Sequence, residues 1–459
     1  MQRLPAIAFL LISFSTTAQV SDSLMIKRIA DTILTNGNAY QNLRVLCKSV
    51  GARLAGSAQM YKAEQWAVKT LQAAGADSVW LQPCMVPRWV RGGKDISTVT
   101  YSDGNGRQQK KTLDVLALGN SISTGAAGVR APVILIHDFN ELERRKDEVK
   151  GKIVFYNYAF NPTYILQGRA YGEAGVYRRS GPSRAAQYGA VAVITRSLSQ
   201  STDNLPHTGS TAYDSVFPRI PCAAVGLRDA DLLSSLLKKG TKVQLYLKTG
   251  GRFLTDTVGH NVIAEIKGSE FPDQYITVGG HLDSWDVGEG AHDDGAGCVQ
   301  SIEVLNVFKR TGYKPRHTIR IVLFANEENG LRGGNKYAEA AKAKGEKHLF
   351  ALESDAGGFT PRGFAFTIST EKLDKLSTFL HLFVPFGVYE FRQGGGGADI
   401  GPLHNLLGVP VAGLSPDSQR YFDVHHARND VFENVHKREL ELGAINMAAL
   451  IYIVDRHGL

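Results

Sequence analysis

The chain has 459 residues, and 43% of them are hydrophobic, which is enough to build the cores of two or more domains. Its formal charge of +8 comes from scattered Lys and Arg residues, and the densest basic groups, Lys110–Lys111 and Arg144–Lys146, have polar or acidic neighbours. This pattern is typical of a solvated surface and argues against nucleic-acid binding.

The N-terminus has the pattern of a secretory signal peptide over residues 1–18. Arg3 precedes the short apolar run Leu4–Phe14, and the small residues Thr16–Ala18 predict cleavage before Gln19. The apolar run is shorter than the about 20 residues that cross a bilayer. No cysteine follows the cleavage site to carry a lipid, and no later segment has the length and hydrophobicity of a membrane span. We therefore predict a secreted or periplasmic protein without a membrane anchor.

Residues 19–110 are predicted to form the N-terminal part of a main domain, and removal of a propeptide from its start is left open. Apolar residues recur at helical spacing in two stretches, 22–34 and 63–74. The Gly-rich turn Gly51–Ser57 separates the two predicted helices, and Gly75 is placed to end the second.

Residues 111–250 have a different pattern and predict an inserted α+β domain. The helical stretch Ser183–Tyr188 interrupts a series of short β-like runs with turn-forming residues between them. These runs lie at 132–137, 152–157, 190–195 and 243–249. No catalytic constellation is recognisable in this region.

Residues 251–459 are predicted to form the main part of the main domain. Strands are predicted at 275–279, 318–324 and 348–352, with helices such as Cys298–Phe308 between them. Alternating strands and helices predict an α/β fold with a mostly parallel central sheet and helices on both faces. Ligands of such sheets bind beyond the carboxyl ends of the strands.

Acidic and histidine residues follow all three predicted strands directly. The first strand is followed by His281-Leu-Asp283, the second by Asn326-Glu327-Glu328 and the third by Glu353-Ser-Asp355. Two more groups, His292-Asp293-Asp294 and His425-His426, lie before the next helix and near the C-terminus. Because the ends of parallel strands meet in one crevice, we expect these side chains to converge.

So many carboxylates in one crevice are tolerable only when cations neutralise them. Imidazole and carboxylate ligands without thiolate suit zinc or a related divalent ion. The spacing of the four cysteines does not match a zinc site, and in an exported chain they permit disulfides with three complete pairings, between which the sequence does not choose. They are Cys47, Cys84, Cys222 and Cys298.

Five motifs in this order resemble the zinc peptidase family M28, which includes bacterial aminopeptidases and glutamate carboxypeptidase II. The motifs are His-x-Asp, Gly-Ala-x-Asp, Glu-Glu-x-Gly, Glu-Ser-Asp-Ala-Gly and a C-terminal His. The stretches Gly279–Gly288, Leu352–Gly357 and Tyr421–His426 are most similar to the plasma glutamate carboxypeptidase (carboxypeptidase Q) branch. The resemblance covers nearly the whole mature chain. It implies a zinc-exopeptidase, phosphorylase/hydrolase-like fold, with the middle insert similar to a protease-associated domain.

The resemblance also implies a site for two zinc ions, or for another divalent metal. In this family pattern one aspartate bridges both metals, and each metal has two further protein ligands. The bridging residue would be Asp293. One metal would take His281 and Asp355, and the other Glu328 and His426.

Two acidic residues beside these ligands receive other roles from the resemblance. Glu327 would be the general base that takes a proton from a metal-bridging water and passes it to the leaving amine. Asp283 would hold the imidazole ring of His281.

Two adjacent histidines compete for the last ligand position. His425 and His426 both follow Val424, and the family pattern places an acidic residue four positions after the ligand. Asp430 stands four positions after His426, so His426 is favoured. His425 or Tyr421 would then donate a hydrogen bond to the oxyanion.

The resulting hypothesis is a secreted, co-catalytic zinc metallopeptidase that removes end residues from dipeptides or short peptides. A carboxypeptidase or dipeptidase is favoured, an aminopeptidase of the same family is the main alternative, and a receptor-like binding protein on the same fold is the non-enzymatic one. A glutaminyl cyclase-like reaction is disfavoured because it uses one zinc. The resemblance implies a homodimer. Arg332, Arg392 and Arg428 are candidates for binding a substrate carboxylate.

Overall fold

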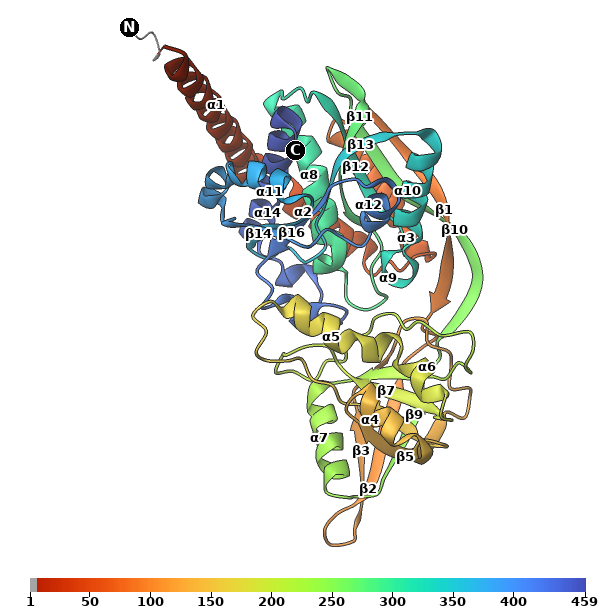
Figure 1. Ribbon diagram of the computed structural model, residues 1–459. Helices are drawn as coiled ribbons and strands as arrows, with labels where there is room; N and C mark the ends of the chain where they lie inside the picture. Colours follow the sequence, from red (N-terminus) through yellow and green to blue (C-terminus); the bar gives the residue numbers. More distant parts are fainter. Residues whose placement is uncertain (1–5) are drawn as a thin grey trace.

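The computed structural model describes residues 6–459, and two eight-stranded sheets form its upper and lower parts in Figure 1. The first sheet consists, in spatial order, of β1 (Ser78–Val90), β10 (Arg252–Ile266), β12 (His317–Phe324), β11 (Phe271–His281), β13 (Lys347–Glu353), β16 (Val411–Pro416), β14 (Pro361–Thr367) and β15 (Glu390–Gln393).

The centre of the first sheet is parallel, as predicted, and antiparallel pairs lie on either side of it. β11 pairs in parallel with both β12 and β13, and β13 pairs in parallel with β16. β10 is antiparallel to β1 and β12, and β14 is antiparallel to β16. β14 pairs in parallel with β15, so four of the seven strand pairs are parallel and three are antiparallel. The sheet is therefore mixed, with parallel pairs in the majority. β1 carries the chain towards the second sheet and β10 carries it back, so these neighbouring strands run in opposite directions.

Helices cover both faces of the first sheet, as the sequence predicts. Successive residues of a strand point to opposite faces, and in β12 Ile321 joins one apolar cluster while Val322 joins another. The first cluster is formed with α1 (Ala6–Asn36), α3 (Ala58–Ala73), α8 (Ala296–Thr311) and α14 (Lys437–His457). The second is formed with α10 (Arg332–Lys344) and α12 (Gly401–Leu407).

The N-terminal helix α1 joins the predicted signal peptide to the main domain. Ile26, Ile29 and Ile33 are buried in the cluster that includes α8 and α14, whereas the start of the helix projects away from the molecule in Figure 1. The predicted signal peptide, residues 1–18, overlaps this start, and its residues 1–5 lie outside the described part. Within residues 6–459, the helices lack the combination of length and hydrophobicity needed to cross a bilayer.

The second sheet uses residues 96–248 and contains all four strands predicted in the insert. The predicted boundary at residue 111 falls inside one of its strands. In spatial order the strands are β3 (Gln108–Leu113), β2 (Ile96–Ser102), β9 (Val243–Lys248), β5 (Val129–Ile136), β6 (Ile153–Tyr156), β7 (Ala192–Arg196), β8 (Cys222–Val225) and β4 (Val115–Ala117). Its helices are α4 (Phe139–Arg144), α5 (Gln167–Arg179), α6 (Gly181–Ala186) and α7 (Leu227–Lys238).

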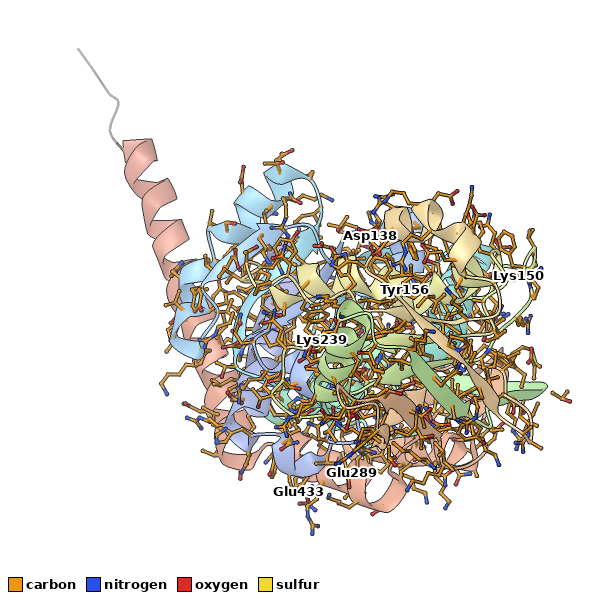
Figure 2. The ribbon with its side chains drawn as sticks, turned by 90° about the horizontal axis from the view of Figure 1, so that it is seen from below. Asp138, Lys150, Tyr156, Lys239, Glu289 and Glu433 are labelled. Atoms are coloured by element: carbon orange, nitrogen blue, oxygen red, sulfur yellow. The ribbon has the colours of Figure 1, made fainter. Side chains whose placement is uncertain are left out.

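The remaining helices are short and lie in the main domain. They are α2 (Ala39–Val45), α9 (Glu327–Gly330), α11 (Thr370–Ser377) and α13 (Tyr421–Val424). After α2, Lys48 contacts Glu289 and Glu433 at 2.7 Å each, and these two glutamates lie side by side in Figure 2. All four cysteines are buried and free, so none of the disulfide pairings left open by the sequence is formed.

Candidate metal centre

Three of the predicted site segments lie at the carboxyl ends of neighbouring parallel strands. His281 is the last residue of β11, Glu327 and Glu328 begin α9 just after β12, and Asp355 follows the end of β13. Val278 of β11 pairs with Ile321 of β12 and with Leu352 of β13, so the three strands end at the same level. The register thus brings these side chains to one edge of the sheet.

The other two predicted ligands come from loops. Asp293 lies in the turn Ala291–Gly295 that leads into α8, and the carboxylate of Asp430 accepts the backbone N–H groups of His292 (2.7 Å) and Asp293 (3.1 Å). His426 follows α13 and has a left-handed backbone, with φ of 61°. Both loops extend over the strand ends.

The five predicted ligands converge in two groups that share Asp293. In the first, His281 Nε2 lies 3.1 Å from Asp293 Oδ1 and 3.4 Å from Asp355 Oδ1. In the second, His426 Nε2 lies 3.1 Å from Asp293 Oδ2 and 3.1 Å from Glu328 Oε2. Each carboxylate oxygen of Asp293 therefore faces one histidine.

These distances fit two zinc ions. Ligand atoms about 2.0–2.1 Å from a tetrahedral zinc lie about 3.3 Å from each other, close to the separations given above. Among residues 6–459, the buried atoms Asp293 Oδ2 and Glu328 Oε1 accept no hydrogen bond. Buried carboxylate oxygens without donors are costly unless a cation neutralises them. The donor set, nitrogen and oxygen without sulfur, also suits zinc.

Glu327 is half-buried and lines the cavity that opens in front of these ligands. Its backbone N–H and that of Glu328 donate to the carboxylate of Asp283, at 3.0 and 3.4 Å. The predicted role of Asp283 therefore changes. His281 Nδ1 is 2.9 Å from the backbone carbonyl of Asp283 but 3.9 Å from its carboxylate. The carboxylate orients the turn that carries Glu327, and the carbonyl orients the ring.

The competing histidine lies beside the second group, but its contact with Asp293 is longer than that of His426. His425 Nε2 is 3.6 Å from Asp293 Oδ2, and the two histidine rings stack with their centroids 3.5 Å apart. The ring of Tyr421 lies 5.0 Å from that of His425, and both residues line the cavity. This arrangement favours His426 as the ligand and leaves both candidate oxyanion donors at the cavity wall.

A cavity of about 1310 Å³ opens in front of the metal centre, and both domains contribute to its wall. From the second domain come residues such as Arg178 and Thr211. Of the three arginines predicted to bind a carboxylate, Arg392 lines the cavity, whereas Arg332 borders another pocket and Arg428 pairs with Asp114. The volume is sufficient for a small peptide.

Without metal, the buried carboxylates and histidines of this cluster shift the pKa values of one another. Burial by itself lowers the pKa of His281 and His426, but Asp355 and Glu328 outweigh it and raise the pKa of both histidines well above the usual range. Burial and the charge of Asp293 raise the pKa of Glu328 to about 7. Both histidines are therefore protonated at neutral pH until a metal displaces the protons.

We expect the affinity for zinc to fall as the pH falls from about 8 to about 6. The ligating histidines bind zinc only when Nε2 is unprotonated, so each proton displaced makes the apparent affinity about tenfold weaker per pH unit. Calorimetric titration in two buffers of different ionisation enthalpy counts the protons released. Zinc binding to the variant His137→Ala, which lacks an exposed histidine, should release the same number of protons as zinc binding to the wild type. Zinc affinity independent of pH would contradict this assignment.

Three features of the site were not recognised as functional from the sequence. Asp430 served only to choose between the two histidines, whereas its carboxylate orients Asp293. Asp294 lies beside the bridging residue, and its carboxylate accepts the N–H of His281 at 3.0 Å. Residues of the second domain, such as Thr208, contact His426, and no motif in the sequence marks them.

Comparison with known proteins identifies the family of this chain. A model of peptidase family M28 matches residues 261–451. Carboxypeptidase Q of Homo sapiens is 35% identical over 416 residues, which cover 91% of this chain and 85% of the relative.

Solved structures share the fold. That of a peptidase M28 precursor from Shewanella amazonensis SB2B has a TM-score of 0.90 and 33% identity, covering 96% of this chain and 98% of the other. An aminopeptidase from Aneurinibacillus sp. strain AM-1 has the same fold, with a TM-score of 0.64 and 21% identity over 94% of this chain and 96% of the other. The order of the motifs, their convergence at the strand ends and these similarities lead to one conclusion: the chain belongs to peptidase family M28.

Proposed function

We propose that this protein is a secreted zinc exopeptidase that hydrolyses dipeptides or short peptides, as a carboxypeptidase or dipeptidase. The observation that carries the proposal is the position of Asp293 between two ligand groups, with Glu327 on the same cavity wall. Similarity along most of the chain to carboxypeptidase Q supports the choice of a carboxypeptidase or dipeptidase. An aminopeptidase of the same family is the alternative.

In this proposal His281 and Asp355 would hold one zinc ion, Glu328 and His426 would hold the other, and Asp293 would be the ligand that the two groups share. Bound zinc lowers the pKa of water and polarises the scissile carbonyl.

The remaining chemistry falls to residues of the cavity wall. Glu327 takes the proton of the attacking water and delivers it to the leaving nitrogen. Its buried, acidic surroundings raise its pKa well above the usual range without metal, and positive charge beside it favours the carboxylate that a base needs. His425 or Tyr421 donates a hydrogen bond to the oxygen that becomes negative in the transition state. A receptor-like binding protein would not need this complete set of groups.

The proposal extends to the setting of the enzyme. A cleaved signal peptide at residues 1–18 would place it outside the cytoplasm, in the periplasm or the medium. The second domain would be protease-associated-like, and its residues would contact the peptide substrate in the cavity that both domains line. A homodimer is proposed on the family resemblance.

The test is a panel of dipeptides with free ends, a blocked amine or an amidated carboxyl group, offered to the zinc-loaded protein. Loss of hydrolysis on amidation alone supports a carboxypeptidase, and loss on either modification supports a dipeptidase. Loss on amine blocking alone would indicate an aminopeptidase. Absence of hydrolysis of the whole panel would contradict the proposal and favour a binding protein.

A further inference from the structure

A loop of the second domain lies directly against the two histidines of the metal centre. The loop is His207–Gly209, between β7 and β8, and its contacts are made mainly by backbone atoms. Thr208 donates its N–H to the carbonyl of His426 at 2.9 Å, and the carbonyl of Thr208 lies 3.2 Å from His426 Nδ1. His207 Nδ1 lies 2.7 Å from the carbonyl of His425. Three contacts thus join segments that are more than 200 residues apart in the sequence.

The contact with Thr208 favours one tautomer of the His426 ring. His426 Nδ1 has two polar neighbours, the carbonyl of Thr208 at 3.2 Å and Nη1 of Arg178 at 3.4 Å. The carbonyl is the nearer of the two, and because it accepts hydrogen bonds and does not donate them, it favours a proton on Nδ1. When a metal displaces the second proton of the ring, the lone pair is on Nε2, the atom that lies 3.1 Å from both Asp293 and Glu328. This is the tautomer that binds a metal through Nε2.

The same loop also supports the backbone of His426. Its φ of 61° is in the left-handed region, which residues other than glycine rarely adopt. The hydrogen bond from Thr208 N–H to its carbonyl, and the one from His207 to the preceding carbonyl, fix the two peptide groups in this conformation. The left-handed turn directs the imidazole towards Asp293.

A buried arginine also contacts the His207–Gly209 loop. Arg178 of α5 is 4% exposed, and it donates to the carbonyl of Thr208 (3.2 Å) and to the hydroxyl of Tyr171 (2.6 Å). Gly209 has a φ of 130°, and a Cβ atom there would lie 2.4 Å from Cζ of Arg178. Only glycine fits under this guanidinium, so the loop and the arginine interlock.

Two further bonds tie the loop to the second sheet. The Thr208 hydroxyl donates to the carbonyl of Ala117 at 2.9 Å, and Gly119 N–H donates to the carbonyl of Gly209 at 3.0 Å. Gly119 in turn contacts the main domain, because a Cβ atom there would lie 1.8 Å from the ring of Trp285. The loop is therefore fixed relative to the second domain at the point where that domain meets the main one.

We propose that the His207–Gly209 loop is a positioning element of the metal centre, which selects the tautomer and orientation of His426. It makes the affinity of one metal position, that of Glu328 and His426, depend on the second domain. The position of His281 and Asp355 does not depend on this loop, because His281 Nδ1 contacts the carbonyl of Asp283 within its own domain. The inference rests on the proposed two-zinc function.

The test uses paired variants of one residue, His207→Ala and His207→Asn. Alanine removes the donor to His425, whereas the amide of asparagine retains one at a similar place. In zinc titrations against a chromogenic chelator, His207→Ala is expected to weaken one of the two zinc positions by about 10- to 100-fold and to leave the other unchanged. His207→Asn should recover most of the loss, and the exposed variant His137→Ala should bind both ions as the wild type does.

Arg178→Gln serves as the second variant if His207→Ala does not fold, and its expected effect is the same selective loss. Cobalt-loaded protein adds a spectroscopic measurement, because the visible absorption of one Co²⁺ position should change in the variants and that of the other should not. Wild-type affinity at both positions in His207→Ala and Arg178→Gln, or equal loss at both, would overturn the inference. A wild-type protein that binds two zinc ions but hydrolyses no peptide would contradict only the proposed function.

Discussion

Replacing Glu327 with glutamine is expected to lower kcat/KM for dipeptide hydrolysis by about 10²- to 10⁴-fold, the usual contribution of a general base. Glutamine has nearly the same shape but cannot accept the proton of the attacking water. The backbone N–H of residue 327 still donates to Asp283, so the turn that also carries Glu328 keeps its position. Zinc content, measured by atomic emission after dialysis, should therefore be unchanged.

The control for this variant is Glu433→Gln. Glu433 is exposed and contacts Lys48 on a different part of the surface, and an exposed ion pair of this kind contributes little. Its activity should match that of the wild type. Full peptidase activity in a zinc-loaded Glu327→Gln protein would refute the assignment of Glu327 as the base.

Replacing Asp293 with alanine is expected to abolish tight binding of both zinc ions and to reduce hydrolysis to the background rate. The two carboxylate oxygens of Asp293 each face one ligand histidine, at 3.1 Å from His281 and 3.1 Å from His426. Its loss leaves each position with two protein ligands, fewer than the three typical of catalytic zinc. Zinc titration and the dipeptide assay on the same preparation measure both effects.

Asp417→Asn is the matched control for Asp293→Ala. Asp417 is also a carboxylate on the cavity wall, but it pairs with Arg362 at 3.2 Å and belongs to neither ligand group. Its zinc content should equal that of the wild type. If Asp293→Ala still bound two ions tightly, the shared-ligand arrangement would be wrong, and the two groups would have to be independent sites.

The position of the site was predictable because parallel strands impose it. His281, Glu328 and Asp355 each follow a predicted strand closely, and once β11, β12 and β13 pair in parallel their ends must coincide. Strand direction at the sheet edges was not predictable in this way. The residues of β10 have no feature that distinguishes a parallel from an antiparallel neighbour, and the direction follows from how the chain returns from the second domain.

The role of Asp283 illustrates a different limit. Its spacing from His281 predicts a carboxylate near the ring, and the two residues are indeed neighbours. The structure places the backbone carbonyl rather than the carboxylate at Nδ1, at 2.9 Å against 3.9 Å. Which of these oxygens faces the ring depends on the local backbone, and that follows from the hydrogen bonds made with the turn at Glu327.

The sequence by itself determined the residue types of the metal centre and, through the order of its motifs, the family. His281, Glu328 and Asp355 follow predicted strands, and local patterns locate strands well, whereas Asp293 and His426 were assigned from the motifs. Only the tertiary structure decided that the carbonyl of Asp283 faces His281 and that a loop of the second domain contacts His426. Hydrogen bonds between Thr208 and His426 depend on how two domains pack, and Thr208 contributes only backbone atoms to them, so no pattern in the sequence pairs the two residues. Distances between such segments are set by the fold as a whole.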